Sequence, residues 1–201
     1  MSGTVLSMRL ARPSDAAAMA ALTRAAYTAW LPETWEEQLP ALADFDAAVH
    51  EHHVELLFVG DTLAGLADLL PEAEALLVES LAVAPEHQGH GHAGRLMTRA
   101  EAVAGELGLA SLRLYTDKTF TANLGLYRHL GFVVDGEETF LGGTIVSMSK
   151  PLGRAAAGEA PQAGVDGGGG AMLCRTLSPS TACSGGPASW RAETHSPFRI
   201  S

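Results

Sequence analysis

The chain has 201 residues, of which 47% are hydrophobic, and its formal net charge at pH 7 is −10. This length and hydrophobic content predict one globular domain of ordinary size with a buried core. The acidic balance argues against a nucleic-acid partner, and the lack of a signal peptide or of an apolar run of about 18 residues predicts a cytoplasmic protein outside the membrane.

Strand-like and helix-like segments alternate from the start of the chain. Residues Val5 to Ala11 alternate apolar and polar side chains, which predicts a half-buried strand. The stretch from Ala16 to Trp30 is rich in helix formers, and Ser14 or Asp15 is placed to cap the helix that it predicts. A loop and one or two short helices are expected before the next strand.

A hairpin and two further strand–helix units complete the predicted domain. The hairpin joins strands at Glu55–Val59 and Leu63–Leu69 through a turn at Gly60 and Asp61. The later elements are expected to be a strand at Glu74–Val83, a helix ending near Leu107, a strand at Ser111–Asp117, a helix at Asn123–Gly131 and two strands at Phe132–Phe140 and Thr144–Lys150. The order β-α-α-β-β-β-α-β-α-β-β predicts an α/β domain with a central sheet.

The composition changes near Pro151. From there to Ser201 the 51 residues hold 9 Gly and 5 Pro, and no sustained periodicity. Such a segment buries too little apolar surface to offset its ordering entropy, so we predict a domain at residues 1–152 and a disordered tail at 153–201. Both cysteines, Cys174 and Cys183, lie in this tail and form neither a disulfide framework nor a four-ligand zinc site.

A glycine-rich loop links the strand that ends at Val83 to the helix that follows. Its glycines, Gly89, Gly91 and Gly94, let the backbone approach a ligand closely. The first N–H groups of a helix lack partners within the helix and lie at the positive end of its dipole. The loop therefore predicts a pyrophosphate site.

Two other interpretations of this loop fit less well. The glycine spacing also matches G-x-G-x-x-G, but a dinucleotide-binding oxidoreductase would place that loop after its first strand. The loop histidines, His87, His90 and His92, could bind zinc only if they converged. Because a phosphate role turns the backbone N–H groups of His90 and His92 to the ligand, we expect their side chains to point outward into solvent and we expect no metal.

Two sequence blocks carry a resemblance to a known family. The first is Gln88-Gly89-His90-Gly91-His92-Ala93, which follows Leu81-Ala82-Val83-Ala84-Pro85. The second is LRLYTDKTFTANLGLYRHLGF, from Leu112 to Phe132. In this order and spacing they resemble the GNAT (Gcn5-related N-acetyltransferase) superfamily. The resemblance implies a GNAT fold: a central mixed, mostly antiparallel sheet of six to seven strands flanked by about four helices.

The resemblance also implies an activity and a co-substrate. It predicts an N-acyltransferase that moves an acetyl group from acetyl-CoA to an amine by direct attack in a ternary complex. A non-catalytic acyl-CoA-binding or regulatory module on the same fold is the alternative, because a fold alone does not fix function. The residues that the resemblance assigns to acetyl-CoA are Leu81, Ala82, Val83, Gln88, Gly89, His90, Gly91, His92, Ala93, Gly94, Asn123 and Tyr127. Arg95 is either a further cation near the phosphates or a solvated helix residue.

Two side chains are candidates for acid–base chemistry. Tyr127 is the candidate acid that protonates the leaving thiolate, or else it is an aromatic residue of the core. Glu79 is the candidate base, because strict alternation along a strand would put it on the same face as Leu81 and Val83. A solvated strand glutamate, with water as the base, is the other interpretation of Glu79.

The resemblance places the amine site at the loop between the first two helices. There Trp30, Glu33 and Trp35 would form an aromatic, acidic pocket for a cationic amine, unless the tryptophans pack in the core. The acceptor is expected to be a small molecule or a peptide. Since dimers are common in the family, the resemblance also suggests a homodimer.

Overall fold

The computed structural model describes residues 5–28, 45–140, 143–153 and 172–175. Its strands are β1 (Leu6–Leu10), β2 (His53–Val59), β3 (Thr62–Pro71), β4 (Ala75–Val83), β5 (Ser111–Asp117), β6 (Val133–Phe140), β7 (Gly143–Pro151) and β8 (Met172–Arg175). Its α-helices are α1 (Ala16–Thr28), α2 (Phe45–Glu51), α3 (His92–Glu106) and α4 (Thr121–His129), with short 3-10 turns at Pro13–Asp15 and Pro85–His87.

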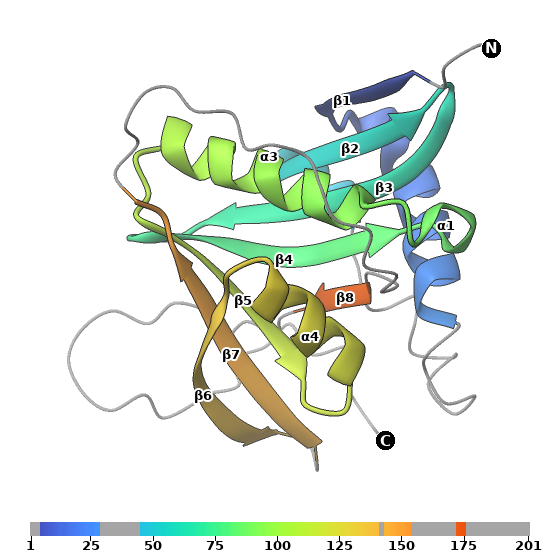
Figure 1. Ribbon diagram of the computed structural model, residues 1–201. Helices are drawn as coiled ribbons and strands as arrows, with labels where there is room; N and C mark the ends of the chain where they lie inside the picture. The colour runs from blue at the N-terminus through green and yellow to red at the C-terminus, as the bar shows by residue number, and fades with distance from the viewer. Residues whose placement is uncertain (1–4, 29–44, 141–142, 154–171, 176–201) are drawn as a thin grey trace, which may run out of the picture.

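All the strands belong to one sheet, shown in Figure 1, with the order β1-β2-β3-β4-β5-β7-β6 and with β8 paired to β4 outside this path. Neighbouring strands are antiparallel except for β4 and β5, which are parallel. The parallel pair follows from the helical crossover through α3, because a parallel connection needs a long return path. The predicted fold class, a mostly antiparallel mixed sheet with about four helices, is confirmed.

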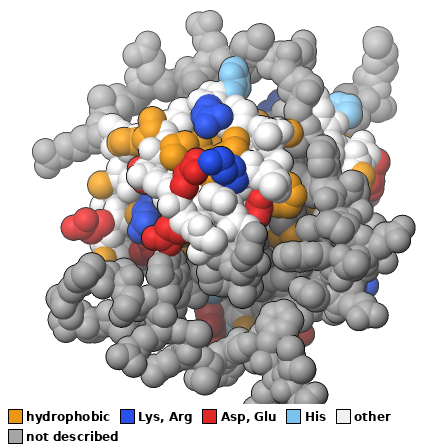
Figure 2. Space-filling model, turned by 90° about the horizontal axis from the view of Figure 1, so that it is seen from below, with side chains coloured by type: hydrophobic (Ala, Val, Ile, Leu, Met, Phe, Trp, Pro, Cys, Tyr) orange, Lys and Arg blue, Asp and Glu red, His pale blue; other side chains and the backbone are white. Residues whose placement is uncertain are grey.

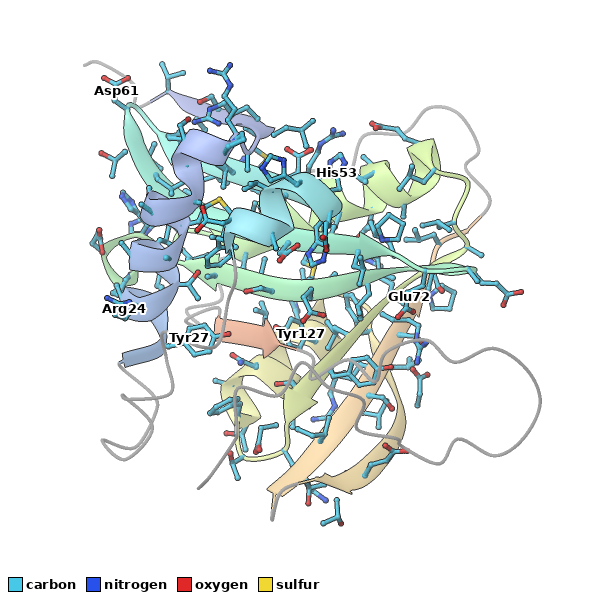
Figure 3. The ribbon with its side chains drawn as sticks, turned by 180° about the vertical axis from the view of Figure 1, so that it is seen from behind. Arg24, Tyr27, His53, Asp61, Glu72 and Tyr127 are labelled. Carbon is cyan, nitrogen blue, oxygen red and sulfur yellow. The ribbon has the colours of Figure 1, made fainter. Side chains whose placement is uncertain are left out.

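Helices cover both faces of the sheet. The apolar face of α3 packs through Leu96, Met97 and Val103 into a core that also includes residues of α4. On the opposite face, Met19 of α1 and Phe45 of α2 pack in a second core. Figure 3, seen from behind, shows α1 and α2 in front of the strands, whereas α3 and α4 lie in front in Figure 1.

The entry into α1 differs in detail from the expected cap. Asp15 ends a 3-10 turn that begins at Pro13, and its carboxylate accepts the backbone N–H of Arg12 at 2.7 Å. Arg9 donates two hydrogen bonds to the same carboxylate, which lowers the pKa of Asp15 to about 2. Asp15 therefore fixes the turn that precedes α1 and the end of β1 together.

One strand lies in the segment expected to be disordered. The four residues Met172–Arg175 form β8 on the edge of β4, so the prediction of disorder is wrong for these four residues. A four-residue run is too short to show a periodicity, and its partner is distant in sequence, so sequence reasoning missed it. The remaining residues of the predicted tail, 154–171 and 176–201, lie outside the described residues.

The described surface carries charges of both signs. Lysine, arginine and acidic side chains are interspersed on the face in Figure 2, without a large area of one sign among its described residues. Within the described ranges, no helix is both long and apolar enough to cross a membrane.

Candidate active site

The two parallel strands at the centre of the sheet part from each other. β4 and β5 pair at Ala75–Leu77 with Ser111–Arg113. Beyond this point β4 continues beside β3 to Val83, and β5 continues beside β7 to Asp117. The carboxyl ends of β4 and β5 therefore diverge, which leaves a gap in the pairing between them. The edge of β4 that faces β5 can pair with an extended chain, and β8 pairs with it at Ser80 and Ala82.

The loop after β4 leads from this gap to the first turn of α3. The Gln88 side chain donates a hydrogen bond from Nε2 to the carbonyl oxygen of Val83 at 3.1 Å, which ties the loop to the end of the strand. Gly89 and Gly91 have φ angles of 77° and 73°, in the left-handed region that favours glycine. A Cβ at either glycine would meet no described atom within 4 Å, so the loop is open on that side.

The N-terminus of α3 has the features of an anion site. Gly91 is the N-cap and supplies no side-chain cap, and no acidic residue lies in the first turn. The N–H groups of His92, Ala93 and Gly94 are thus left for a ligand at the positive end of the helix. Arg95 is exposed in the same turn and forms no ion pair with any described residue.

Of the two loop histidines expected to point into solvent, His92 is buried instead. His92 is only 7% exposed, whereas His90 is exposed as expected. The ring of His92 lies 6.0 Å from that of His90 and 6.1 Å from that of His87. Burial, and then the nearby positive charges of His87, His90 and Arg95, lower the pKa of His92 and favour its neutral form. The prediction that His92 is solvated is wrong, because it packs at the base of the loop.

Two observations characterise the loop histidines His87, His90 and His92. The Nδ1 atom of His92 is buried and has no hydrogen-bond partner among the described residues. Across the described part of the chain, no group of three or more His, Cys, Asp or Glu side chains is placed to hold a metal ion. His92 therefore contributes a neutral ring with a buried, unpartnered nitrogen at the base of the loop.

A β-bulge changes the expected position of Glu79. Asp68 of β3 pairs with Ser80, and the adjacent Leu69 pairs with Val78, so Glu79 is an extra residue on β4. Val78 and Leu81 consequently belong to the same core, although strict alternation would put them on opposite faces. The reasoning that put Glu79 on the face of Leu81 is therefore wrong, because alternation does not hold across a bulge.

Electrostatics place Glu79 near the face that α1 and α2 cover. His52, which follows α2, hydrogen-bonds through Nδ1 to Oδ1 of Asp68 at 2.8 Å. This hydrogen bond raises the pKa of His52, burial opposes the rise, and the charges of Asp68, Glu79 and Glu51 add to it. Glu79 is partly buried and within electrostatic reach of His52. Glu79 therefore lies near the His52–Asp68 pair, on the side of the sheet that α1 and α2 cover.

Asn123 and Tyr127 lie one turn apart on the buried face of α4. Their exposed fractions are 2% and 0%, and the Tyr127 ring meets that of Phe132 edge-to-face at 5.9 Å between centroids. Tyr127 belongs to the core that also includes Leu81 and Val83 of β4. Figure 3 labels Tyr127 near the centre of the molecule. Both interpretations of Tyr127, as core aromatic and as acid, are compatible with this position.

Sequence reasoning missed two hydroxyl groups beside the gap. Ser80 and Thr116 each lie three residues beyond the last β4–β5 pair, Leu77 with Arg113. They are 5% and 2% exposed, and neither hydroxyl oxygen has a hydrogen-bond partner among the described residues. An unpartnered buried hydroxyl is costly, so these atoms suit a ligand with polar groups. A serine or threonine in a strand carries no sequence signal of this kind, because only the divergence of the strands creates the gap.

The predicted acceptor residues Trp30, Glu33 and Trp35 lie outside the described residues. A surface hollow of about 340 Å³ lies elsewhere, beside α2 and the end of β1, and His52 and His53 line it. The loop before α3 and the ends of β4 and β5 do not line this hollow. We place the functional site at the gap because the strand divergence and the N-terminus of α3 meet there.

Comparisons with known proteins agree with this arrangement. The sequence profile of a family described as "Acetyltransferase (GNAT) family" matches residues 17–132. Among curated proteins, no sequence matches the chain.

Solved structures share the fold at low identity. The PaiA N-acetyltransferase of Thermoplasma acidophilum, in complex with coenzyme A, has a TM-score of 0.65 at 18% identity and aligns over 73% of this chain and 99% of its own. The ribosomal-protein-S18-alanine N-acetyltransferase of Escherichia coli has a TM-score of 0.60 at 18% identity, over 78% and 99%. A GNAT family acetyltransferase of Elizabethkingia anophelis, with acetyl-CoA bound, has a TM-score of 0.52 at 17% identity, over 73% and 98%.

Proposed function

Since this chain belongs to the GNAT acetyltransferase family, we propose that it transfers an acetyl group from acetyl-CoA to an amine in a ternary complex. The observation that carries the proposal is the divergence of β4 and β5 next to an uncapped helix N-terminus. A diphosphate-bearing, amide-bearing thioester is complementary to both features. Two of the structural neighbours were solved with coenzyme A or acetyl-CoA.

The diphosphate of acetyl-CoA would bind the loop before α3. Its oxygens would accept hydrogen bonds from the N–H groups of the first turn, where the helix dipole favours negative charge. Gly89 and Gly91 hold the backbone open there, and Gln88 fixes the loop to Val83. The guanidinium of Arg95 would add a positive charge at the rim.

The pantetheine arm would lie in the gap along β4. Its two amide groups can pair with the free edge of a strand, as an added strand would. The backbone of Leu81, Ala82 and Val83 would supply that edge once β8, which pairs with Ala82, has left it. Asn123 supplies a buried amide on α4. Ser80 and Thr116 would give their unpartnered hydroxyls to the same ligand.

The reaction is a single displacement at the thioester. The lone pair of a neutral amine attacks the carbonyl carbon, the carbon–sulfur bond breaks, and the products are an amide and the coenzyme A thiol. In our proposal Glu79, or a water that it orients, takes the proton that the amine nitrogen loses. The phenol of Tyr127 protonates the departing sulfur and is then reprotonated by solvent.

The acceptor is an amine on a small molecule or on a peptide. The acidic net charge of the chain suits a cationic acceptor, and one structural neighbour is by its name an acetyltransferase of a protein alanine. Trp30, Glu33 and Trp35 stay predictions for the acceptor pocket, as do a cytoplasmic location and a homodimer.

Ligand-dependent stability tests the co-substrate. Acetyl-CoA at about 100 times its dissociation constant should raise the free energy of unfolding by about 2.7 kcal/mol, which thermal unfolding of the full chain would show. NAD, offered at the same concentration, should leave the unfolding temperature unchanged. A shift with NAD and none with acetyl-CoA would overturn the proposal in favour of a dinucleotide-binding protein.

A further inference from the structure

The chain itself fills the gap between the divergent strands. β8 pairs antiparallel with β4, with Met172 opposite Ala82 and Arg175 opposite Ser80. It also contacts β5, on the other side of the gap, and lies between the two strands in Figure 1. The free edge of β4 is thus the docking site of a segment that follows the last strand of the domain by about twenty residues.

The edge that β8 occupies is the edge that the pantetheine arm needs. The other edge of β4 is taken by β3, which pairs Asp68 with Ser80 and Leu66 with Ala82. Each backbone N–H and C=O on the β8 side can face only one extended partner at a time, because adjacent strands in a sheet lie about 4.8 Å apart. β8 and the acyl-CoA arm cannot both pair with this stretch.

We propose that the edge of β4 from Ser80 to Ala82 is a binding site for an extended peptide strand, that the chain's own Met172–Arg175 is its occupant, and that acyl-CoA and this strand exclude each other. The inference rests on the proposed function, since it assumes that the acyl-CoA arm uses this gap. The docked strand then makes the chain autoinhibited, and acyl-CoA binding requires β8 to leave.

The length of β8 makes it displaceable. A four-residue strand that pairs with β4 along one edge forms few backbone hydrogen bonds. Its covalent link to the domain nevertheless keeps its local concentration high. If the strand is docked roughly nine-tenths of the time, the apparent dissociation constant for acetyl-CoA is about tenfold above its intrinsic value. Acyl-CoA at sufficient concentration would still bind and release the strand.

A double proline substitution in the full chain tests this exclusion. Successive N–H groups of a strand point to opposite sides, so Leu173→Pro together with Cys174→Pro removes a donor on the β4 side whichever residue provides it. The matched control is Ala155→Pro together with Ala156→Pro, which adds the same two prolines outside the described residues. Acetyl-CoA binding is measured by calorimetry for both variants and for the unmodified chain.

The expected result is tighter binding in the β8 variant by about tenfold, with the control equal to the unmodified chain. Equal affinity in all three proteins would overturn the inference and leave the proposed function intact. Binding of acetyl-CoA by none of them would instead overturn the proposed function, so the two failures are distinguishable. In the β8 variant, a synthetic peptide of residues 170–177 at millimolar concentration should weaken acetyl-CoA binding.

Hydrogen exchange gives a readout without any substitution. In the full chain the amides of Met172–Arg175 should be partly protected, and saturating coenzyme A should remove that protection. The amides of β4 should stay protected throughout, because the arm replaces β8 as their neighbour. Protection of Met172–Arg175 that persists or rises with coenzyme A would contradict mutual exclusion.

Discussion

Leu77 of β4 pairs with Arg113 of β5, and among the described residues no later residue of one strand pairs with the other. Three features of the site are related to this point of divergence. It frees one edge of β4, it puts the loop before α3 at the mouth of the gap, and it leaves Ser80 and Thr116 with unpartnered hydroxyls.

The left-handed conformation of Gly91 predicts that a side chain at this position lowers stability and weakens acetyl-CoA binding. Gly91→Ala adds a Cβ at a φ of 73°, so we expect a loss of about 1 kcal/mol in the free energy of unfolding. It should also weaken acetyl-CoA binding, because the loop N–H groups move. Gly105→Ala is the control, since Gly105 lies near the end of α3 with no positive φ and with open space for a Cβ. Equal effects of the two substitutions on binding would contradict the anion site.

The hydroxyl of Thr116 predicts effects of opposite sign on stability and binding. Thr116→Val keeps the shape and removes a buried oxygen without a described partner, so the chain without ligand should gain about 1 kcal/mol of stability. Acetyl-CoA binding should weaken in the same variant. Denaturant unfolding and calorimetry measure the two quantities, and a loss of stability would show that the hydroxyl already has a partner.

The phenol of Tyr127 predicts a defect in the chemical step. Tyr127→Phe should lower kcat by about 100-fold, the lower end for general acid catalysis, with little change in the dissociation constant of coenzyme A. Tyr115→Phe, on β5, is the control, because Tyr115 accepts a hydrogen bond from Arg113 and has no role in the proposed reaction. Full turnover by Tyr127→Phe would leave Tyr127 as an aromatic residue of the core.

The proposed role of Glu79 as base predicts that its substitution changes the pH profile of kcat/KM. If Glu79 removes the amine proton, Glu79→Gln should lower kcat/KM by about 100-fold at neutral pH and remove the acidic limb of the profile. Glu138→Gln, an exposed residue of β6, should change neither. A profile that keeps its acidic limb in Glu79→Gln would assign the proton to a water path that does not depend on this carboxylate.

The His52–Asp68 pair predicts how stability depends on pH. The hydrogen bond to Asp68 raises the pKa of His52 in the folded chain above its ordinary value near 6.5. The folded state therefore binds a proton more tightly than the unfolded state, and this contribution is complete below pH 6.5 and is lost as the pH rises through the raised pKa. Denaturant unfolding across this range should show stability falling with pH, and His52→Gln should flatten the slope. His129→Gln, at an exposed position, should leave it unchanged.

Sequence reasoning predicted the framework well because its signals are local. The Gly60–Asp61 turn between two strand-like runs located the hairpin of β2 and β3. The i, i+3, i+4 spacing located α3 with its buried Leu96 and Val103. Proline and glycine marked the end of β4 and the loop before α3. These patterns depend on neighbours within one element, so they can be recognised without knowledge of the tertiary structure.

What the sequence could not predict depends on contacts between distant elements. The bulge at Glu79 exists only as a shift in register against β3. The burial of His92 depends on how the loop packs, and β8 exists only as a partner of β4. The bulge and β8 each depend on pairing with another strand, and the burial of His92 depends on the conformation of the whole loop. None of the three leaves a periodic pattern within its own element.

The most direct test of the central proposal is release of free thiol from acetyl-CoA by the full chain, measured with a panel of amines that includes small amines, amino acids and peptide N-termini. We predict thiol release that depends on both the chain and an amine, with one class of acceptor preferred and with release lowered in Tyr127→Phe. Saturable acetyl-CoA binding without thiol release for any amine would contradict catalysis and would favour a non-catalytic acyl-CoA-binding module.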